Sequence, residues 1–138
     1  MSSDKRIVFD TSTLVSAVLK PQSIPAKAVS WGWEVAEVVV SSETLEEVRL
    51  VLNRDRLDAF RDREARLAFF EHYQAMTVLH PVTEIIVACR DPKDDKFLSL
   101  AVSVGASLLI SSDEDLLVLQ CVRGVTILRP KQFVDLCE

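Results

Sequence analysis

Short apolar runs alternate with segments of helical periodicity along the whole chain, and this alternation constrains the fold more than any other feature. The runs predict five strands, at residues 6–9, 35–40, 77–82, 108–110 and 125–128. Because they are apolar on both faces, they favour a mostly parallel sheet covered by helices on both sides. We therefore expect an α/β fold, a three-layer α/β/α arrangement around a central five-stranded sheet whose strand order stays open.

The segments between these runs carry the start and stop signals of helices. Pro25 suits the first turn of one helix, and Gly105 suits the position just past the end of another. On the latter helix we expect Lys96, Ser99 and Ser103 to form a polar stripe. The predicted helices cover residues 11–20, 25–31, 42–53, 62–76, 95–104, 113–120 and 130–136, with a short extended piece at 85–87.

Composition sets limits on the class of protein. A length of 138 residues predicts one domain over residues 1–138, and 49% apolar with 27% charged residues excludes a disordered chain. No apolar run approaches the roughly 18 to 20 residues of a membrane span. The segment Met1–Arg6 leads into only a brief apolar stretch, so we expect no secretory signal and a cytoplasmic location. Three scattered cysteines and two histidines argue against zinc.

Acidic residues recur where predicted strands end and helices begin. In open parallel sheets, ligands bind beyond the carboxyl ends of the strands, which is where these acids fall. Helix capping explains each acid taken singly, but four such places favour a shared site. Asp10 is the hardest to dismiss, because a lone charge after a buried strand costs several kcal/mol unless it is paired or bound. The acids are Asp10, Glu43, Glu46, Glu47, Asp94, Asp95 and Asp113.

Converging carboxylates require a cation. Two like charges about 4 Å apart repel by about 4 kcal/mol at an effective dielectric of 20. An all-oxygen donor set suits Mg²⁺ or Mn²⁺, so we expect one or two such ions. Sites of this kind activate water and stabilise a phosphoryl group during displacement.

Helical phase selects among neighbouring acids. Glu47 lies beside the apolar face of its helix and Glu46 lies almost opposite, so we predict Glu47 as the ligand, with Glu43 in reserve. Asp95 is nearer the polar stripe of its helix, which predicts Asp95 as a ligand and Asp94 as a cap or supporting residue.

The last acidic place and the basic residues complete the candidate site. Asp113 is closest to its strand, Asp115 supports it, and Ser111 and Ser112 are placed to bind a carboxylate or water. The net charge of −5 argues mildly against a nucleic-acid partner. Six arginines nevertheless fall within 18 residues and are candidates to guide phosphates, although interleaved acids favour a salt-bridged surface equally. They are Arg49, Arg54, Arg56, Arg61, Arg63 and Arg66.

In their order along the chain, these motifs resemble the PIN-domain family of metal-dependent nucleases, most closely its toxins of toxin–antitoxin modules. The resemblance rests on residues 8–14, 42–48, 91–101 and 110–117, and on the ending at 129–133. It implies a PIN-like fold with an acidic quartet of Asp10, Glu47, Asp95 and Asp113, and places the family's Ser or Thr near the last acid at Ser111. Ser12 stands where the family often has Asn, a difference that we expect to affect the rate of the reaction and not its type.

The resemblance further implies cleavage of RNA by a water that Mg²⁺ or Mn²⁺ activates. It also implies a homodimer, and an antitoxin that inhibits by covering the crevice.

Two other functions stay open. A phosphatase of the haloacid-dehalogenase type would use Asp10 as a nucleophile, but it normally has a second Asp where this chain has Ser12. A catalytically inactive scaffold would bind RNA or a protein without cleavage. No glycine follows the first strand and no G-x-S-x-G motif occurs, which excludes dinucleotide-binding, P-loop and serine hydrolase functions.

Overall fold

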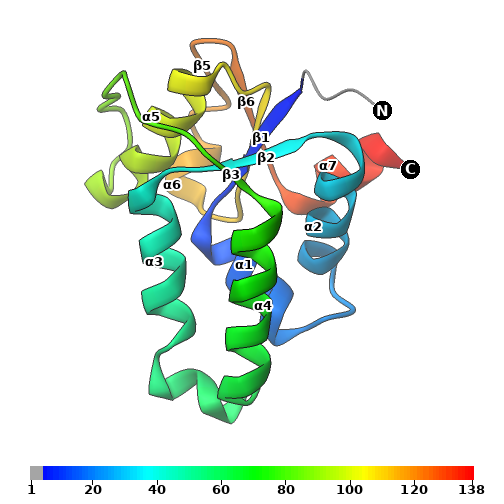
Figure 1. The fold of residues 1–138 in the computed structure, drawn as a ribbon. Coiled ribbons are helices and arrows are strands. Elements are labelled where there is room, and N and C mark those ends of the chain that lie inside the picture. The colour runs from blue at the N-terminus through cyan, green and yellow to red at the C-terminus, as the bar shows by residue number, and fades with distance from the viewer. Residues whose placement is uncertain (1–4) are drawn as a thin grey trace.

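The computed structural model describes residues 5–138; residues 1–4, on which part of the expectation about a secretory signal rests, lie outside the described residues. Six strands form one sheet in the order β3-β2-β1-β4-β6-β5, between two layers of helices (Figure 1). The strands are β1 (Arg6–Phe9), β2 (Glu37–Val40), β3 (Val78–Leu79), β4 (Leu108–Ile110), β5 (Cys121–Val122) and β6 (Val125–Leu128).

The predicted three-layer architecture and mostly parallel sheet are confirmed. All pairs are parallel except β5 with β6, which form an antiparallel hairpin at one edge. The prediction missed β5 because a two-residue strand has no measurable periodicity. Residues 77–82 are shorter as a strand than predicted, since only Val78 and Leu79 pair with β2.

Seven α-helices are described, and they match the seven predicted helices with shifts at their ends. Two short 3₁₀ helices, which were not predicted, are also described. The helix after Pro25 begins at Ile24 and continues to Val35, and the one after Asp113 ends at Leu117. The α-helices are α1 (Thr11–Leu19), α2 (Ile24–Val35), α3 (Ser42–Leu52), α4 (Arg63–Met76), α5 (Asp95–Val104), α6 (Glu114–Leu117) and α7 (Pro130–Cys137). The 3₁₀ helices are η1 (Asp55–Ala59) and η2 (Pro92–Asp94).

Alternate residues of the central strands pack on opposite faces of the sheet, as strand geometry requires. Ile7 and Phe9 of β1 pack in one apolar cluster with α1, α2, α3, α4 and α7. Val8 packs in the other cluster with α5 and α6. Because β1, β2 and β4 are parallel, their carboxyl ends lie along the same edge of the sheet.

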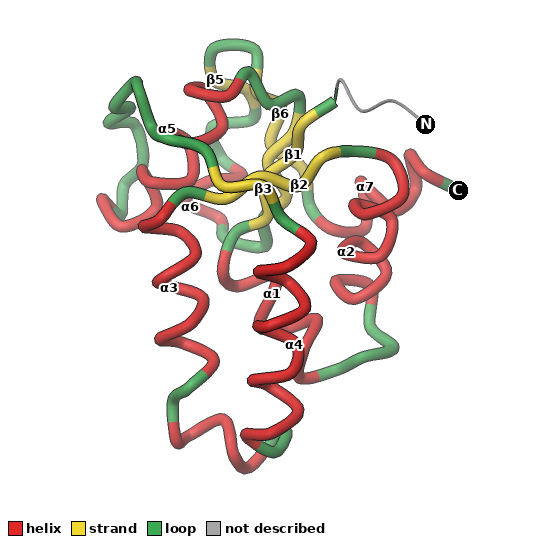
Figure 2. Tube along the Cα trace, in the orientation of Figure 1, coloured by secondary structure: helices red, strands yellow, loops and turns green. Residues whose placement is uncertain are grey.

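Helices α3 and α4 form a hairpin that extends away from the sheet (Figures 1 and 2). The fully buried guanidinium of Arg66 fixes its closed end, donating to the carbonyls of Leu52 at 2.8 Å, Arg54 at 3.0 Å and Arg61 at 3.0 Å, and pairing with Asp58. This arginine therefore fixes the turn between α3 and α4, and its buried guanidinium is not available to bind RNA.

The segment from Thr83 to Cys89 lies extended against α5 and pairs with its side chains. The Ser99 hydroxyl accepts from the N–H of Ile86 at 2.9 Å, and the Ser103 hydroxyl accepts from two further N–H groups. The segment thus covers the two serines of the predicted polar stripe, whose hydroxyls supply hydrogen bonds that a neighbouring strand would otherwise provide. Lys96, the third member of the stripe, donates to Glu47 instead. No helix in residues 5–138 is long and apolar enough to cross a membrane.

Candidate functional site

Asp10 follows β1 and is 3% exposed. Its Oδ1 accepts from the N–H of Thr13 at 2.9 Å, which caps α1, and its Oδ2 accepts from the hydroxyls of Ser12 at 2.9 Å and of Ser111. Burial raises the pKa of this carboxyl above its ordinary value, and the hydrogen bonds offset the effect only in part. Asp10 is therefore both a helix cap and a buried charge that no cationic side chain among the described residues contacts.

Ser111 and Asp113 extend this network beyond β4. The Ser111 hydroxyl also accepts from the N–H of Asp113 at 2.9 Å, which links the loop after β4 to Asp10. Asp113 in turn accepts from the N–H of Asp115 through Oδ1 at 2.9 Å, and Arg90 approaches Asp115 at 3.1 Å from a mostly exposed position. The side chain of Ser112 is exposed.

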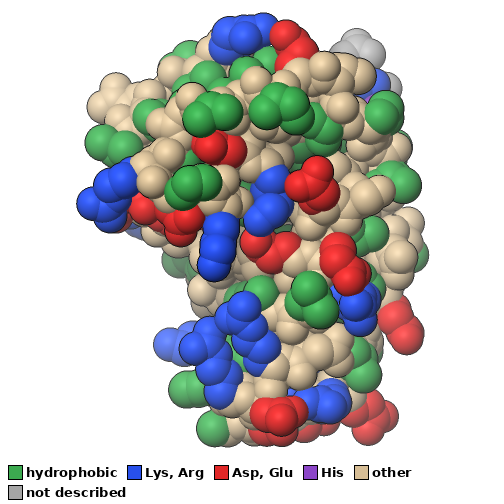
Figure 3. Space-filling model, turned by 90° about the vertical axis from the view of Figure 1, so that its left-hand side faces the viewer, with side chains coloured by type: hydrophobic (Ala, Val, Ile, Leu, Met, Phe, Trp, Pro, Cys, Tyr) green, Lys and Arg blue, Asp and Glu red, His purple; other side chains and the backbone are tan. Residues whose placement is uncertain are grey.

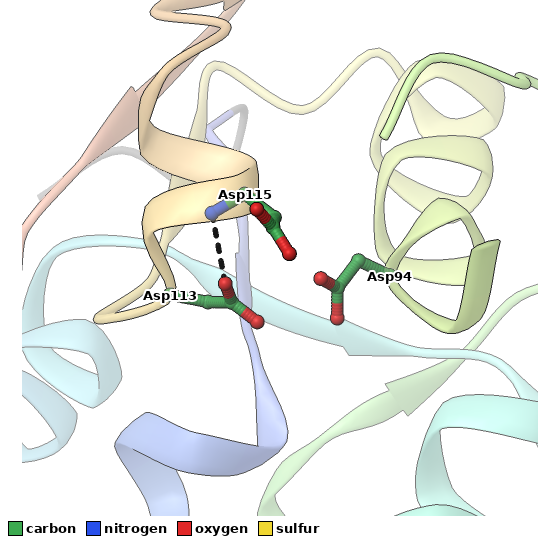
Figure 4. Close-up of side chains that lie close together, drawn as sticks. All are labelled: Asp94, Asp113 and Asp115. Atoms are coloured by element: carbon green, nitrogen blue, oxygen red, sulfur yellow. Dashed lines mark hydrogen bonds between the residues drawn. The ribbon is translucent and has the colours of Figure 1, made fainter. Parts of the chain in front are cut away.

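Three carboxylates lie close together beside the loop that follows β4. Asp94, Asp113 and Asp115 each offer an oxygen, and these oxygens lie within 4.8 Å of one another (Figure 4). The Oδ2 atom of Asp94 is buried without a hydrogen-bond partner among the residues described. The pKa of Asp94 is raised to about 7 by burial, then by the hydrogen bond that a protonated Asp94 shares with Asp113, and then by the charges of Asp113, Asp91 and Asp10.

The structure exchanges the places predicted for Asp94 and Asp95. Asp94 makes no capping hydrogen bond and faces the other acids. Asp95 accepts through Oδ1 from the N–H groups of Ala88 at 3.0 Å and Cys89 at 2.8 Å. Burial opposes ionisation of Asp95, but these hydrogen bonds hold its pKa below the ordinary value.

The positions of the two aspartates in the helical repeat of α5 distinguish them. Asp94, Leu98 and Ala101 are spaced four and three residues apart, so they lie on one helical face, and the latter two are fully buried. Asp95 shares its face with Ser99, which holds the extended segment. The prediction chose Asp95 because it is nearer the polar stripe, whereas the structure places Asp94 with Asp113 and Asp115.

Glu47 lies beside this cluster without being part of it. Its Oε1 accepts from the ammonium of Lys96 at 2.6 Å, and its Oε2 accepts from the hydroxyl of Thr11, the residue after Asp10. Glu46 points to solvent and pairs with Arg49, while Glu43 is exposed in the first turn of α3. Of the predicted quartet, Asp10, Glu47 and Asp113 thus border one region, and Asp95 does not.

The acids present suit a hard divalent cation. The donors are all carboxylate oxygens, the donor type that Mg²⁺ and Mn²⁺ prefer. One of those oxygens is buried with no partner, which is costly unless a cation or proton satisfies it. Like charges packed this closely keep one proton bound near neutral pH, and a cation would release it.

Comparisons with known proteins agree with this architecture. The family model described as PIN domain matches residues 6–115. Uncharacterized protein MJ1680 of Methanocaldococcus jannaschii is 30% identical over 118 residues, covering 83% of this chain and 75% of that protein.

Two solved structures share the fold. One is the crystal structure of VapBC2 from Rickettsia felis bound to a DNA fragment from their promoter; its chain is matched with a TM-score of 0.62 at 11% identity, over 90% of this chain and 98% of that one. The other is PAE2754 from Pyrobaculum aerophilum, matched with a TM-score of 0.65 at 15% identity, over 97% of this chain and 90% of that one.

Proposed function

The chain belongs to the PIN-domain family, whose members are generally nucleases, and from that premise we propose that it is a metal-dependent endoribonuclease. The observation that carries the proposal is the unpartnered, buried oxygen of Asp94 among three converging carboxylates at the carboxyl ends of the strands. A site made of carboxylates with one unsatisfied oxygen is suited to a cation and poorly suited to an uncharged ligand.

Asp94, Asp113 and Asp115 would hold Mg²⁺ or Mn²⁺, one or two ions, and the nearby charge of Asp10 would add to the negative potential of the site. When bound, the ion would supply an activated water and stabilise charge on the phosphoryl group. The protein's own contribution is position. Ser111 fixes Asp10 and the loop of Asp113 relative to each other through a single hydroxyl, so neither acid moves independently of the other.

Glu47 and Lys96 contribute a pair of opposite charges at the edge of the site. Lys96 donates to Glu47 at 2.6 Å and to the carbonyl of Lys93 at 2.9 Å, and it is 21% exposed. A phosphate arriving at the acids needs a cationic contact to offset their charge, and Lys96 is an ammonium that two hydrogen bonds hold in place on the first turn of α5. Glu47 thus orients Lys96 toward the substrate.

We assign the approach path of RNA to the face bearing α3 and η1. Figure 3 shows Lys and Arg side chains on both sides of an indentation in this face, with acidic side chains between them. Arg54 and Arg56 are exposed and have no ionic partner among the described residues, whereas Arg49 forms an ion pair with Glu46. Arg54 and Arg56 are therefore the stronger candidates for phosphate contacts.

The phosphatase alternative is weaker, because Asp10 is buried, its oxygens accept hydrogen bonds from Thr13, Ser12 and Ser111, and Ser12 stands where such an enzyme normally has its second Asp. A scaffold without catalysis is also weaker, since it gives no reason to bury an unsatisfied carboxylate oxygen. The shared fold with the VapBC2 chain supports our further assignment of this protein as the toxin of a toxin–antitoxin pair, acting as a homodimer that an antitoxin inhibits.

The test is cleavage of mixed single-stranded and structured RNAs with Mg²⁺ or Mn²⁺. We expect the wild-type protein to cleave, Asp10→Asn to be slower by about 10²- to 10³-fold, and chelation to abolish cleavage. Asp135→Asn, at an exposed position of α7, is the matched control and should cleave at the wild-type rate. Equal cleavage by wild type and Asp10→Asn would identify a contaminating nuclease and end the proposal.

A further inference from the structure

We propose that the cavity beside the acidic cluster is a nucleobase pocket, which binds one base of the RNA next to the phosphodiester that is cut. This inference rests on the proposed function and adds a specificity site to it. The cavity has a volume of about 260 Å³ and lies between the extended segment after β3 and the first turns of α5. Pockets for drug-sized ligands start at about 300 Å³, so this one suits a single ring system.

The cavity has the chemistry of a base site. Its wall is aliphatic, formed by Val82, Ile85, Ile86 and Val87 with Pro92, and an apolar wall of this kind favours the flat face of a base over a phosphate or sugar. Ile85 and Val87 are 77% and 83% exposed, and hydrating large apolar side chains exposed to this extent costs free energy. A ligand that covers them is favoured.

Charged groups of both signs line the cavity, Lys93 and Lys96 against Glu43 and Asp95, and this combination suits a nucleotide, which offers both phosphate oxygens and amino groups. Lys93 and Lys96 line the same cavity, and Lys96 contacts Glu47 at the edge of the acidic cluster. A polymer with a base in this cavity would therefore place its flanking phosphates beside two ammonium groups and next to the cluster. An apolar peptide would offer no anionic group to Lys93, whose ammonium makes no ion pair among the described residues, or to Lys96, which is paired only with Glu47.

The lining side chains that still have a free hydrogen-bonding group determine which bases the cavity prefers. Ser41 and Ser99 already use their hydroxyls within the protein, whereas the carboxylate of Glu43 makes no hydrogen bond among the described residues. Carboxylates accept hydrogen bonds from amino groups of bases, as they do from cytosine N4. The pocket should therefore bind a base that carries an exocyclic amino group more tightly than it binds uracil.

The wall can be tested without touching the acids. The double variant Ile85→Ala/Val87→Ala removes two exposed side chains, and Val118→Ala/Leu136→Ala is the matched control, because those residues are 71% and 69% exposed on α6 and α7 sides of the molecule. Melting temperatures of both should equal that of wild type. Cleavage of a short RNA library, randomised on both sides of the cut, then gives the base preference at each position.

We expect the wall variant to lose base preference at one position beside the cut, with KM raised about 5- to 10-fold and kcat changed less than about twofold. Glu43→Gln should shift that same preference, and the control pair should change nothing. Unchanged preference and KM in the wall variant would overturn the pocket, while loss of cleavage in Asp10→Asn would still support the proposed function.

Binding provides a second readout that does not depend on cleavage. In the Asp113→Asn background, RNA hexamers that differ in one base are titrated by fluorescence anisotropy, with and without the wall substitutions. Base-dependent binding that the wall substitutions abolish would support the pocket even if wild type cleaved no RNA. Binding that ignores the wall, or a wall variant that changes only the oligomeric state in solution, would overturn it.

Discussion

Asp10 and Arg66 are both ionisable side chains almost without exposure, at 3% and 0%, yet their surroundings differ in kind. Arg66 donates to three backbone carbonyls and pairs with Asp58. Asp10 accepts only from uncharged donors, and its pKa is raised by burial. A buried charge with a complete set of partners stabilises the scaffold, whereas one that burial disfavours, beside other like charges, marks a place where a cation is expected.

The largest expected effect is on the stability of the protein when Arg66, the buried charge with a full set of partners, is removed. Arg66→Ala removes one guanidinium and leaves three carbonyls of the α3–α4 turn without their donor. We expect the free energy of unfolding to fall by about 3–5 kcal/mol, measured by urea denaturation. Arg63→Ala breaks an ion pair with Asp55 that is mostly exposed, and should cost no more than about 1 kcal/mol. Equal losses in the two variants would show that Arg66 is not the residue that fixes the turn.

The next effect separates two neighbouring aspartates. Asp94→Asn removes the ligand whose oxygen has no partner, so Mn²⁺ affinity measured by calorimetry should fall at least about 10- to 100-fold. Asp95→Asn alters hydrogen bonds to Ala88 and Cys89, and should change the affinity less than about threefold. If Asp95→Asn weakened metal binding as much as Asp94→Asn, the residue predicted from sequence would be the ligand after all.

These two aspartates also show how far the sequence could lead. The strand–helix alternation and the apolar periodicity were sufficient for the three layers. The position of acids after strands predicted that Asp10 and Asp113 lie near each other, and Ser111 links them. The 100° step of a helix was enough to separate Glu47 from the solvated Glu46. All of these are local properties, readable within one element and its neighbour.

What the sequence did not reveal depends on contacts between distant elements. The side of α5 on which Asp95 lies is set by the extended segment that packs there, and that segment has no periodicity of its own to announce it. The buried role of Arg66 depends on carbonyls from α3 and the η1 turn. Neither contact leaves a pattern in the residues that make it.

A smaller effect, with the opposite sign to that of Arg66, is expected at Asp10. Asp10→Asn removes a buried charge while Asn keeps an oxygen for the N–H of Thr13. Without metal, we expect a melting temperature equal to or above that of wild type, by calorimetry. Asp10→Ala is the matched variant, and losing the cap should make it about 1 kcal/mol less stable than Asp10→Asn. A clear loss of stability in Asp10→Asn would mean that the charge itself is structural.

The smallest effect is the pH dependence of the metal-free protein. The pKa of Asp94 is about 7 in the folded protein against 3.8 as its ordinary value, so the folded state binds more protons between these limits. The contribution of Asp94 to stability therefore falls as pH rises from about 4 to 7, and is constant above that range. Because Asp94 is only partly buried, solvent screening keeps the change below about 1 kcal/mol, a few degrees in melting temperature.

The wild type minus Asp94→Asn difference isolates this contribution, since the raised pKa of Asp10 acts with the same sign in both proteins. Calorimetric melting temperatures across that range should show wild type losing stability relative to Asp94→Asn as the carboxyl ionises. Asp135→Asn should run parallel to wild type, because its carboxylate is exposed and paired with Lys131 on α7. Saturating Mg²⁺ should reverse the slope, because the cation favours the ionised carboxylates that the metal-free fold disfavours. A slope that is unchanged by Asp94→Asn would place the proton on another member of the cluster and would remove Asp94 from its centre.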